Sequence, residues 1–131
     1  MKYVIIGNSA AGVSCAETIR EYDKEGTVTI VSEEKFPAYS RPLISYYLKD
    51  KVTEEVMHLR DSSHFDKLGI DVITGTRAVD VDTVAKTVLL DNSDKLYYDK
   101  LMLATGSVPF VPPVEGTDGK KNIYTFLNIA S

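Results

Sequence analysis

The sequence predicts an α/β fold, in which a parallel sheet built around a strand–helix–strand unit carries an inserted three-stranded antiparallel meander. Two observations lead to this prediction. An apolar strand, a glycine-containing turn, a helical pattern and a β-branched strand follow one another within about 30 residues. Later in the chain, three short strands joined by polar turns interrupt this alternation of strands and helices.

The strand–helix–strand unit occupies the first part of the chain. Residues 2–6 form a continuous apolar run, which is typical of a strand buried on both faces. Residues 10–23 show helical spacing of apolar residues, with Glu17, Arg20 and Glu21 on the other faces. Residues 27–31 are all β-branched and predict a second strand. The two strands should be parallel, as in Rossmann-like folds.

The remaining elements are expected in the order in which the chain presents them. A short helix, a longer helix and a third parallel strand are predicted at 43–48, 53–68 and 71–74. The strands of the meander are predicted at 77–82, 87–90 and 95–98. A further buried parallel strand is predicted at 100–106, and a connector rich in proline and glycine follows at 108–131.

Composition excludes several classes of function. The net charge of −4 gives no basic footprint, so nucleic acid is not an expected partner. No apolar run approaches the roughly 18 residues that span a bilayer, and a cytoplasmic location is expected by default. Cys15 is the single cysteine of the sequence, which excludes an intrachain disulfide. His58 and His64 lack a metal-ligand spacing, so no metal site is expected.

The turn at residues 7–12 predicts a phosphate site. It reads Gly7-Asn8-Ser9-Ala10-Ala11-Gly12, which is the Gly-x-Gly-x-x-Gly pattern with Ser9 at the second glycine position. Such a turn brings a pyrophosphate onto the backbone N–H groups at the beginning of a helix. Serine is small and its hydroxyl can donate to phosphate, so we expect binding to survive this change.

Two further residues point to an adenosine nucleotide. Glu33 lies 21 residues after Gly12, close to the ~20 expected for an acid that accepts hydrogen bonds from ribose hydroxyls. The alternative is that Glu33 and Glu34 are solvated loop acids. Arg41 could pair with pyrophosphate oxygens, and its alternative is a surface arginine in a tight turn.

These motifs, together with a strand ending in Ala104-Thr105-Gly106, resemble the FAD-binding part of the pyridine-nucleotide–disulfide oxidoreductase superfamily. The stretch Tyr39-Ser40-Arg41-Pro42 resembles the branch that contains NADH:rubredoxin reductases, ferredoxin reductases, apoptosis-inducing factor and the flavoprotein section of nitrite reductase. The resemblance implies an FAD/NAD(P)-binding fold. It also implies that FAD is held by Gly7, Ser9, Ala10, Ala11, Gly12, Glu33, Glu34, Arg41, Pro42, Thr105, Gly106 and the backbone at Ala78 or Val79.

The resemblance also implies a function. The parent protein would be an FAD-dependent NAD(P)H oxidoreductase that passes electrons from NAD(P)H through FAD to a rubredoxin- or ferredoxin-like protein or a nitrite-reductase-type partner. No catalytic residue is expected in this chain, and no cysteine lies near 41–48 for thiol chemistry.

The domain organisation follows from the same resemblance. Residues 1–107 would be the first section of a split FAD-binding domain, and residues 108–131 a connector toward an absent NAD(P)H-binding domain. The chain is therefore expected to be a fragment that is inactive alone. Two alternatives remain open: an NAD-binding Rossmann domain of a dehydrogenase, and a nucleotide-binding module without turnover. The sequence leaves the oligomeric state undetermined.

Overall fold

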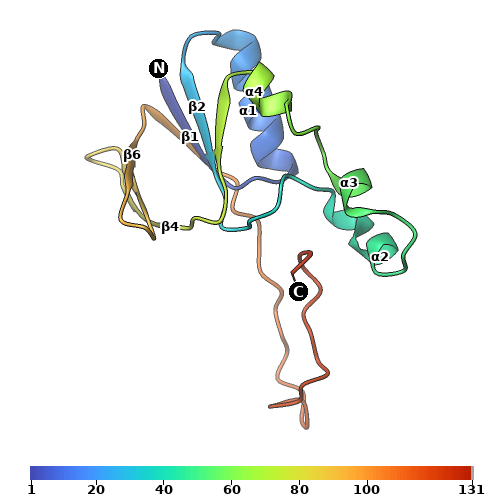
Figure 1. The fold of residues 1–131 in the computed structure, drawn as a ribbon. Helices are drawn as coiled ribbons and strands as arrows, with labels where there is room; N and C mark the ends of the chain where they lie inside the picture. Colours follow the sequence, from blue (N-terminus) through green and yellow to red (C-terminus); the bar gives the residue numbers. More distant parts are fainter. Residues whose placement is uncertain (131) are drawn as a thin grey trace.

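The computed structural model describes residues 1–130, and it has three layers (Figure 1). A four-stranded parallel sheet lies in the middle, with strand order β3-β2-β1-β7. Helices α1 (Ala10–Tyr22) and α4 (His64–Lys67) pack on one face, and the meander packs on the other. The four strands are β1 (Lys2–Ile6), β2 (Thr27–Val31), β3 (Ile70–Ile73) and β7 (Lys100–Leu103). The predicted α/β fold is confirmed.

Strand β1 is buried by different neighbours on its two faces. Ile5 packs with Ala16 of α1 and Ile30 of β2. Val4 packs against the opposite layer, where Val88 of the meander is fully buried. Successive side chains of a strand point to opposite faces, so a strand between two apolar layers needs apolar residues at every position. This explains the continuous apolar run in the sequence.

The antiparallel meander is confirmed close to its predicted bounds. It consists of β4 (Ala78–Asp82), β5 (Thr87–Leu90) and β6 (Lys95–Tyr97), in that order. Only one face of this small sheet is buried, which matches its alternation of apolar and polar residues. Val88 and Leu90 of β5 supply that face. The meander therefore covers the second face of the parallel sheet.

The prediction of one helix over residues 53–68 is wrong. The segment forms two separate turns of helix, α3 (Glu54–Met57) and α4, with irregular chain between them. His58 is extended (φ −61°, ψ 131°) and forms an isolated antiparallel bridge with Tyr39. The Leu59 N–H donates to the Ala38 carbonyl at 2.8 Å. This pairing with a distant segment interrupts the helix, which local sequence alone does not predict.

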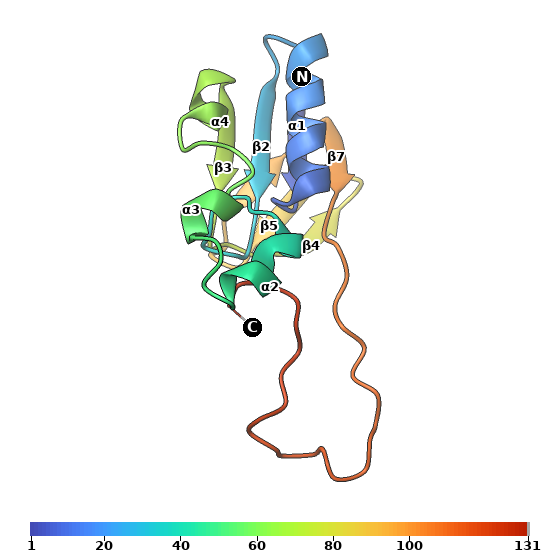
Figure 2. The ribbon, with the colours of Figure 1, turned by 90° about the vertical axis from the view of Figure 1, so that its right-hand side faces the viewer.

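Strand β7 also departs from expectation. It ends at Leu103 rather than at residue 106. Within residues 1–130, β1 is the only strand that pairs with β7. Leu103 is 64% exposed, so this edge strand is not the buried strand that was predicted. Beyond it, the chain forms a long arm that leaves the body and returns to it (Figures 1 and 2). None of the helices within residues 1–130 has the length and apolar character that crossing a bilayer requires.

A small lobe lies beside the carboxyl edge of the sheet. It includes the 3₁₀ helix η1 (Arg41–Leu43) and helix α2 (Ile44–Tyr47), close to the helix predicted at 43–48. Its own core consists of Tyr39, Ile44 and Met57. Ile129, from the returning end of the arm, packs against this core. The lobe is thus the surface on which the arm ends.

Arg20, in helix α1, forms hydrogen bonds with the connections that lead into β2 and β3. Its side chain is buried, and its guanidinium donates to the carbonyls of Leu68 (2.7 Å) and Gly69 (2.8 Å) before β3. It also donates to the carbonyls of Asp23 (2.9 Å) and Gly26 (2.8 Å) before β2. One fork-shaped donor therefore satisfies carbonyls of two connections at once.

We predict that Arg20→Leu lowers the free energy of unfolding by about 3 kcal/mol, because four carbonyl acceptors, including that of the buried Gly26, lose their donor. Urea unfolding followed by far-UV circular dichroism measures this. Arg77→Leu is the matched control, since the Arg77 side chain is 70% exposed and a surface change should stay within about 0.5 kcal/mol. Equal effects of the two substitutions would contradict the role of Arg20.

Glu17 links helix α1 to the segment before α4. Its carboxylate accepts from Arg60 through Nε (2.6 Å) and Nη2 (2.9 Å), and it lies 2.7 Å from His64 Nε2. The hydrogen bond and charge of Arg60, together with His64, hold the pKa of Glu17 below its ordinary value of 4.5. The ionised form of Glu17 is therefore the one that the fold stabilises.

A carboxylate with a lowered pKa contributes stability above its unfolded pKa, and this contribution is lost as pH falls below about 4.5. We expect Glu17→Gln to lower the free energy of unfolding by about 1 kcal/mol at pH 7. The difference from the wild type should shrink as pH falls below that value. Urea midpoints across pH measure this, with Glu21→Gln on the exposed side of the same helix as control. A deficit that is independent of pH would show that charge is not the cause.

Candidate functional site

The candidate site lies at the carboxyl edge of the parallel sheet. Backbone hydrogen bonds of 2.8 Å join the segments that leave this edge: Gly7 N–H to the Val31 carbonyl, Ser32 N–H to the Ile73 carbonyl, and Ala104 N–H to the Ile6 carbonyl. The glycine turn, the two acids and the Ala-Thr-Gly segment therefore meet at one edge. In open α/β sheets, ligands bind at this edge.

Packing requires glycine at both ends of the turn. Gly7 has φ +121°, and a Cβ built there would lie well under 3.0 Å from the Ala104 carbonyl oxygen. A Cβ on Gly12 would lie equally close to the Gly7 carbonyl oxygen and would also touch Ile5. Helix α1 thus approaches the turn and β1 as closely as backbone atoms allow. At both glycines of the predicted turn, the close approach of other backbone atoms leaves no room for a side chain.

The beginning of helix α1 is open toward a ligand. Ser9 is the N-cap in extended conformation (φ −122°, ψ −166°), which any residue adopts, and its side chain makes no capping hydrogen bond. Ala10 and Ala11 are exposed, and the first turn carries no acid. The first N–H groups of a helix have no partner within the helix and form its positive end. These residues fit a pyrophosphate group of a dinucleotide cofactor.

Asn8 is a feature of this turn that sequence reasoning missed. Its side-chain Oδ1 is buried and has no hydrogen-bond partner among residues 1–130. A buried polar atom without a partner carries a cost of about 1–3 kcal/mol. Its type and place gave no signal in the sequence, because the position between the first two glycines of the pattern accepts any residue.

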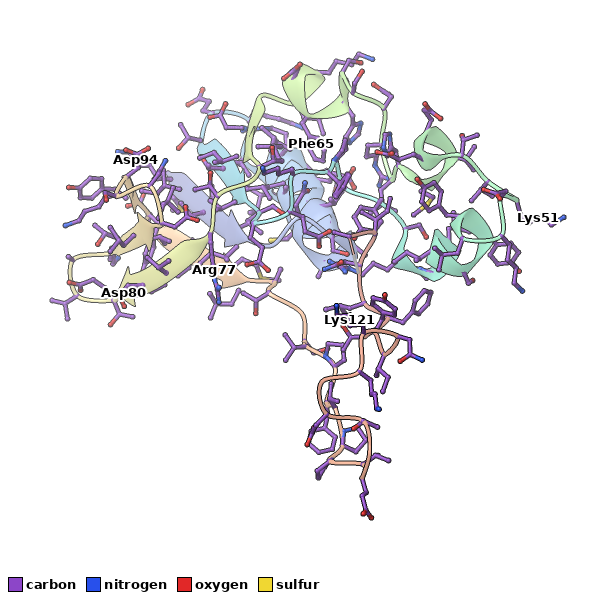
Figure 3. The ribbon with its side chains drawn as sticks, turned by 60° about the horizontal axis from the view of Figure 1, so that its bottom comes forward. Lys51, Phe65, Arg77, Asp80, Asp94 and Lys121 are labelled. Carbon is purple, nitrogen blue, oxygen red and sulfur yellow. The ribbon has the colours of Figure 1, made fainter. Side chains whose placement is uncertain are left out.

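The two adjacent acids after β2 have different surroundings. The Glu33 side chain is 67% exposed, and its carboxylate lies 3.6 Å from Nε of Arg77. Arg77 is similarly exposed just before β4 (Figure 3). An exposed pair at this distance is weak. The carboxylate of Glu33 is therefore accessible at the edge where the glycine turn lies.

Glu34, by contrast, is engaged on both carboxylate oxygens. One accepts from the Tyr39 hydroxyl at 2.6 Å, and the other accepts from Nη2 of Arg41. Arg41 also donates through Nη1 to the Leu127 carbonyl (2.9 Å). Burial and the hydrogen bond to Glu34 raise the pKa of Tyr39. Tyr39 is another residue that sequence reasoning quoted without a role of its own, and one of its partners, Ile129, lies 90 residues along the chain.

The remaining predicted residues lie at or near the same edge. Thr105 and Gly106 are exposed just beyond β7, and Gly106 has φ +69°. Pro42 is exposed at the beginning of η1. Ala78 is half-buried at the start of β4, where an irregularity in the β4–β5 pairing follows it. The contact of each of these residues with a cofactor stays a prediction.

Comparison with known proteins agrees with this geometry. The sequence matches the family described as pyridine nucleotide-disulphide oxidoreductase over residues 1–130. It is 35% identical over 125 residues to an NADH oxidase of Methanocaldococcus jannaschii, covering 90% of this chain and 28% of that protein. It is 38% identical over 127 residues to an NAD(P)H nitrite reductase of Bacillus subtilis, covering 96% of this chain and 16% of that protein.

Solved structures give the same result. The fold matches the NADH:rubredoxin oxidoreductase of Clostridium acetobutylicum with a TM-score of 0.87 and 26% identity, covering 98% of this chain and 33% of that one. It matches the covalent putidaredoxin reductase–putidaredoxin complex with a TM-score of 0.81 and 31% identity, covering 88% and 28%. The chain thus spans no more than a third of any of these relatives. Its turn, its sheet and its match over residues 1–130 show that the chain belongs to the pyridine nucleotide-disulphide oxidoreductase family.

Proposed function

We propose that this chain is the FAD-binding part of an NAD(P)H-dependent flavoprotein reductase. Membership of the family implies FAD as the cofactor and NAD(P)H as the substrate of the whole protein. Residues 1–107 form the first section of the FAD-binding domain, and residues 108–131 connect it toward an NAD(P)H-binding domain. When bound, FAD supplies the redox chemistry, taking a hydride from NAD(P)H and passing electrons on.

One observation carries the proposal: the Gly7–Gly12 turn, closed by backbone packing, lies beside the uncapped beginning of helix α1. The N–H groups of Ala10, Ala11 and Gly12 would bind the pyrophosphate, with the Ser9 hydroxyl as a further donor. No bulky or acidic side chain stands in the first turn. The residues of this chain bind and orient the cofactor, and none acts as a general acid or base.

Glu33 is the acid that we assign to the adenosine ribose. Its carboxylate is accessible, and it follows the strand next to β1, so it lies at the same edge of the sheet as the turn. Two ribose hydroxyls can donate to its two oxygens. The same negative charge disfavours a nucleotide that carries a 2′-phosphate. Thr105, Gly106, Pro42 and the backbone at Ala78 complete the proposed contacts.

The electron acceptor that we propose is a small redox protein of the rubredoxin or ferredoxin type, or a nitrite-reductase-type partner. The support comes from the relatives: one solved structure is a reductase–putidaredoxin complex, another is an NADH:rubredoxin oxidoreductase, and one relative is a nitrite reductase. Because this chain spans so little of those proteins, the acceptor stays part of the proposal.

The proposal is tested by cofactor uptake. The chain is incubated with FAD and, separately, with NADH; free ligand is removed by gel filtration, and absorption spectra are recorded. We expect retained flavin absorbance and no retained NADH, because the NADH site belongs to the second domain. Retention of NADH without flavin uptake would favour the dehydrogenase alternative and contradict the proposal.

The ribose assignment is tested by Glu33→Gln. We expect the dissociation constant for FAD to rise about tenfold, since a hydrogen bond to a charged group is lost. The change should leave urea unfolding within about 0.5 kcal/mol of the wild type. Glu21→Gln, far along helix α1, is the control and should not alter the titration. An unchanged affinity in Glu33→Gln would remove Glu33 from the site.

A further inference from the structure

Glu33 and Glu34 differ by one position and yet face different environments. Glu33 is 67% exposed and paired only loosely, whereas the Glu34 side chain is 20% exposed. A ribose ligand needs free acceptor positions on its carboxylate. Glu34 already accepts from a tyrosine hydroxyl on one oxygen and from a guanidinium on the other. The adjacent acids are therefore unequal candidates for the same task.

Both partners of Glu34 also form hydrogen bonds with residues at the end of the arm. Arg41 donates to the Leu127 carbonyl at 2.9 Å, and the Tyr39 hydroxyl accepts from the Ile129 N–H at 3.1 Å. The Arg41 guanidinium also lies over the Tyr39 ring, 5.5 Å from its centre. The Ile129 side chain packs against the lobe core that includes Tyr39. Two routes thus lead from one carboxylate to residues 127–129.

The Tyr39 hydroxyl explains why a carboxylate is needed here. A hydroxyl has one hydrogen, and by donating it to Glu34 the oxygen of Tyr39 turns its lone pairs toward the Ile129 N–H. Arg41 needs an anion in this half-buried place, and its fork lets it bind Glu34 and Leu127 together. Without Glu34, neither Tyr39 nor Arg41 is held in the orientation that meets the arm.

We propose that the two acids divide their roles: Glu33 is the ribose ligand, and Glu34 is a positioning residue that orients Arg41 and Tyr39 and through them holds residues 127–129 against the lobe. The arm over 104–126 is then fastened at both ends at the cofactor edge. One end is Ala104, packed on Gly7, and the other is this contact. The role of Glu33 rests on the proposed function, whereas that of Glu34 does not.

The experiment compares Glu33→Gln with Glu34→Gln in the chain without cofactor. Hydrogen exchange of the Ile129 amide, followed by NMR, reports the contact directly. We expect exchange about fivefold faster in Glu34→Gln and unchanged in Glu33→Gln. Tyr39→Phe keeps the ring packed and removes only the hydroxyl, so it should also speed exchange at Ile129. A purely packing role of Tyr39 predicts no change there.

A double variant tests whether the residues act in series. The effects of Glu34→Gln and Tyr39→Phe on exchange at Ile129 should be less than additive, because Glu34 acts on this amide through the Arg41–Leu127 contact and also through the Tyr39 hydroxyl. Additive effects would overturn the route through Tyr39. Unchanged exchange in Glu34→Gln would overturn the positioning role altogether.

FAD titration then separates the two acids. Glu33→Gln should weaken binding about tenfold, and Glu34→Gln by less than about threefold. Equal weakening, with Ile129 exchange unaffected by Glu34→Gln, would make Glu34 a second ribose ligand and contradict the proposal. If the wild-type chain takes up no FAD, the proposed function fails in this chain, while the exchange measurements still decide the role of Glu34.

Discussion

The close approach of helix α1 to the turn after β1 is the constraint on which the rest of the structure depends. Only a hydrogen atom fits between Gly12 and the Gly7 carbonyl, and only a hydrogen fits between Gly7 and Ala104. These two contacts bring three elements together: β1, α1 and the segment after β7. Because they join backbone to backbone, no side-chain rearrangement can replace them.

The layers on the two sides of the sheet protect this arrangement. β1 buries Ile5 under the helices and Val4 under the meander, so it cannot slip in register without exposing one set and crowding the other. Arg20 holds the opposite end of the sheet by bonding to four carbonyls of two connections. The edge that bears the candidate site is thus positioned by contacts distributed over the whole body.

At that edge, neighbouring charged residues differ in their exposure and in their hydrogen-bond partners. Glu33 and Arg77 are exposed and weakly paired, which leaves the carboxylate accessible to a ligand. Glu34, Tyr39 and Arg41 form a compact group whose donors and acceptors are used within the protein, including the contacts to Leu127 and Ile129. The proposed nucleotide site and a structural contact therefore lie side by side, each at one of two consecutive acids.

The sequence by itself determined the succession of strands along the chain, the glycine turn, the meander and the family, because these follow from local patterns: apolar runs, residues that permit special backbone geometry, and spacing. It also located Glu33 and Arg41 as residues of interest. Only the tertiary structure decided that His58 is extended rather than helical, since its partner Tyr39 is distant in the chain. The structure alone also revealed that Arg20 is buried, that β7 lies at an edge, and that the group of Glu34, Tyr39 and Arg41 contacts Leu127 and Ile129. The periodicity of a sequence indicates which residues can be buried and which can be exposed. It does not indicate which side chains contact one another, because those contacts depend on how the tertiary fold brings distant segments together.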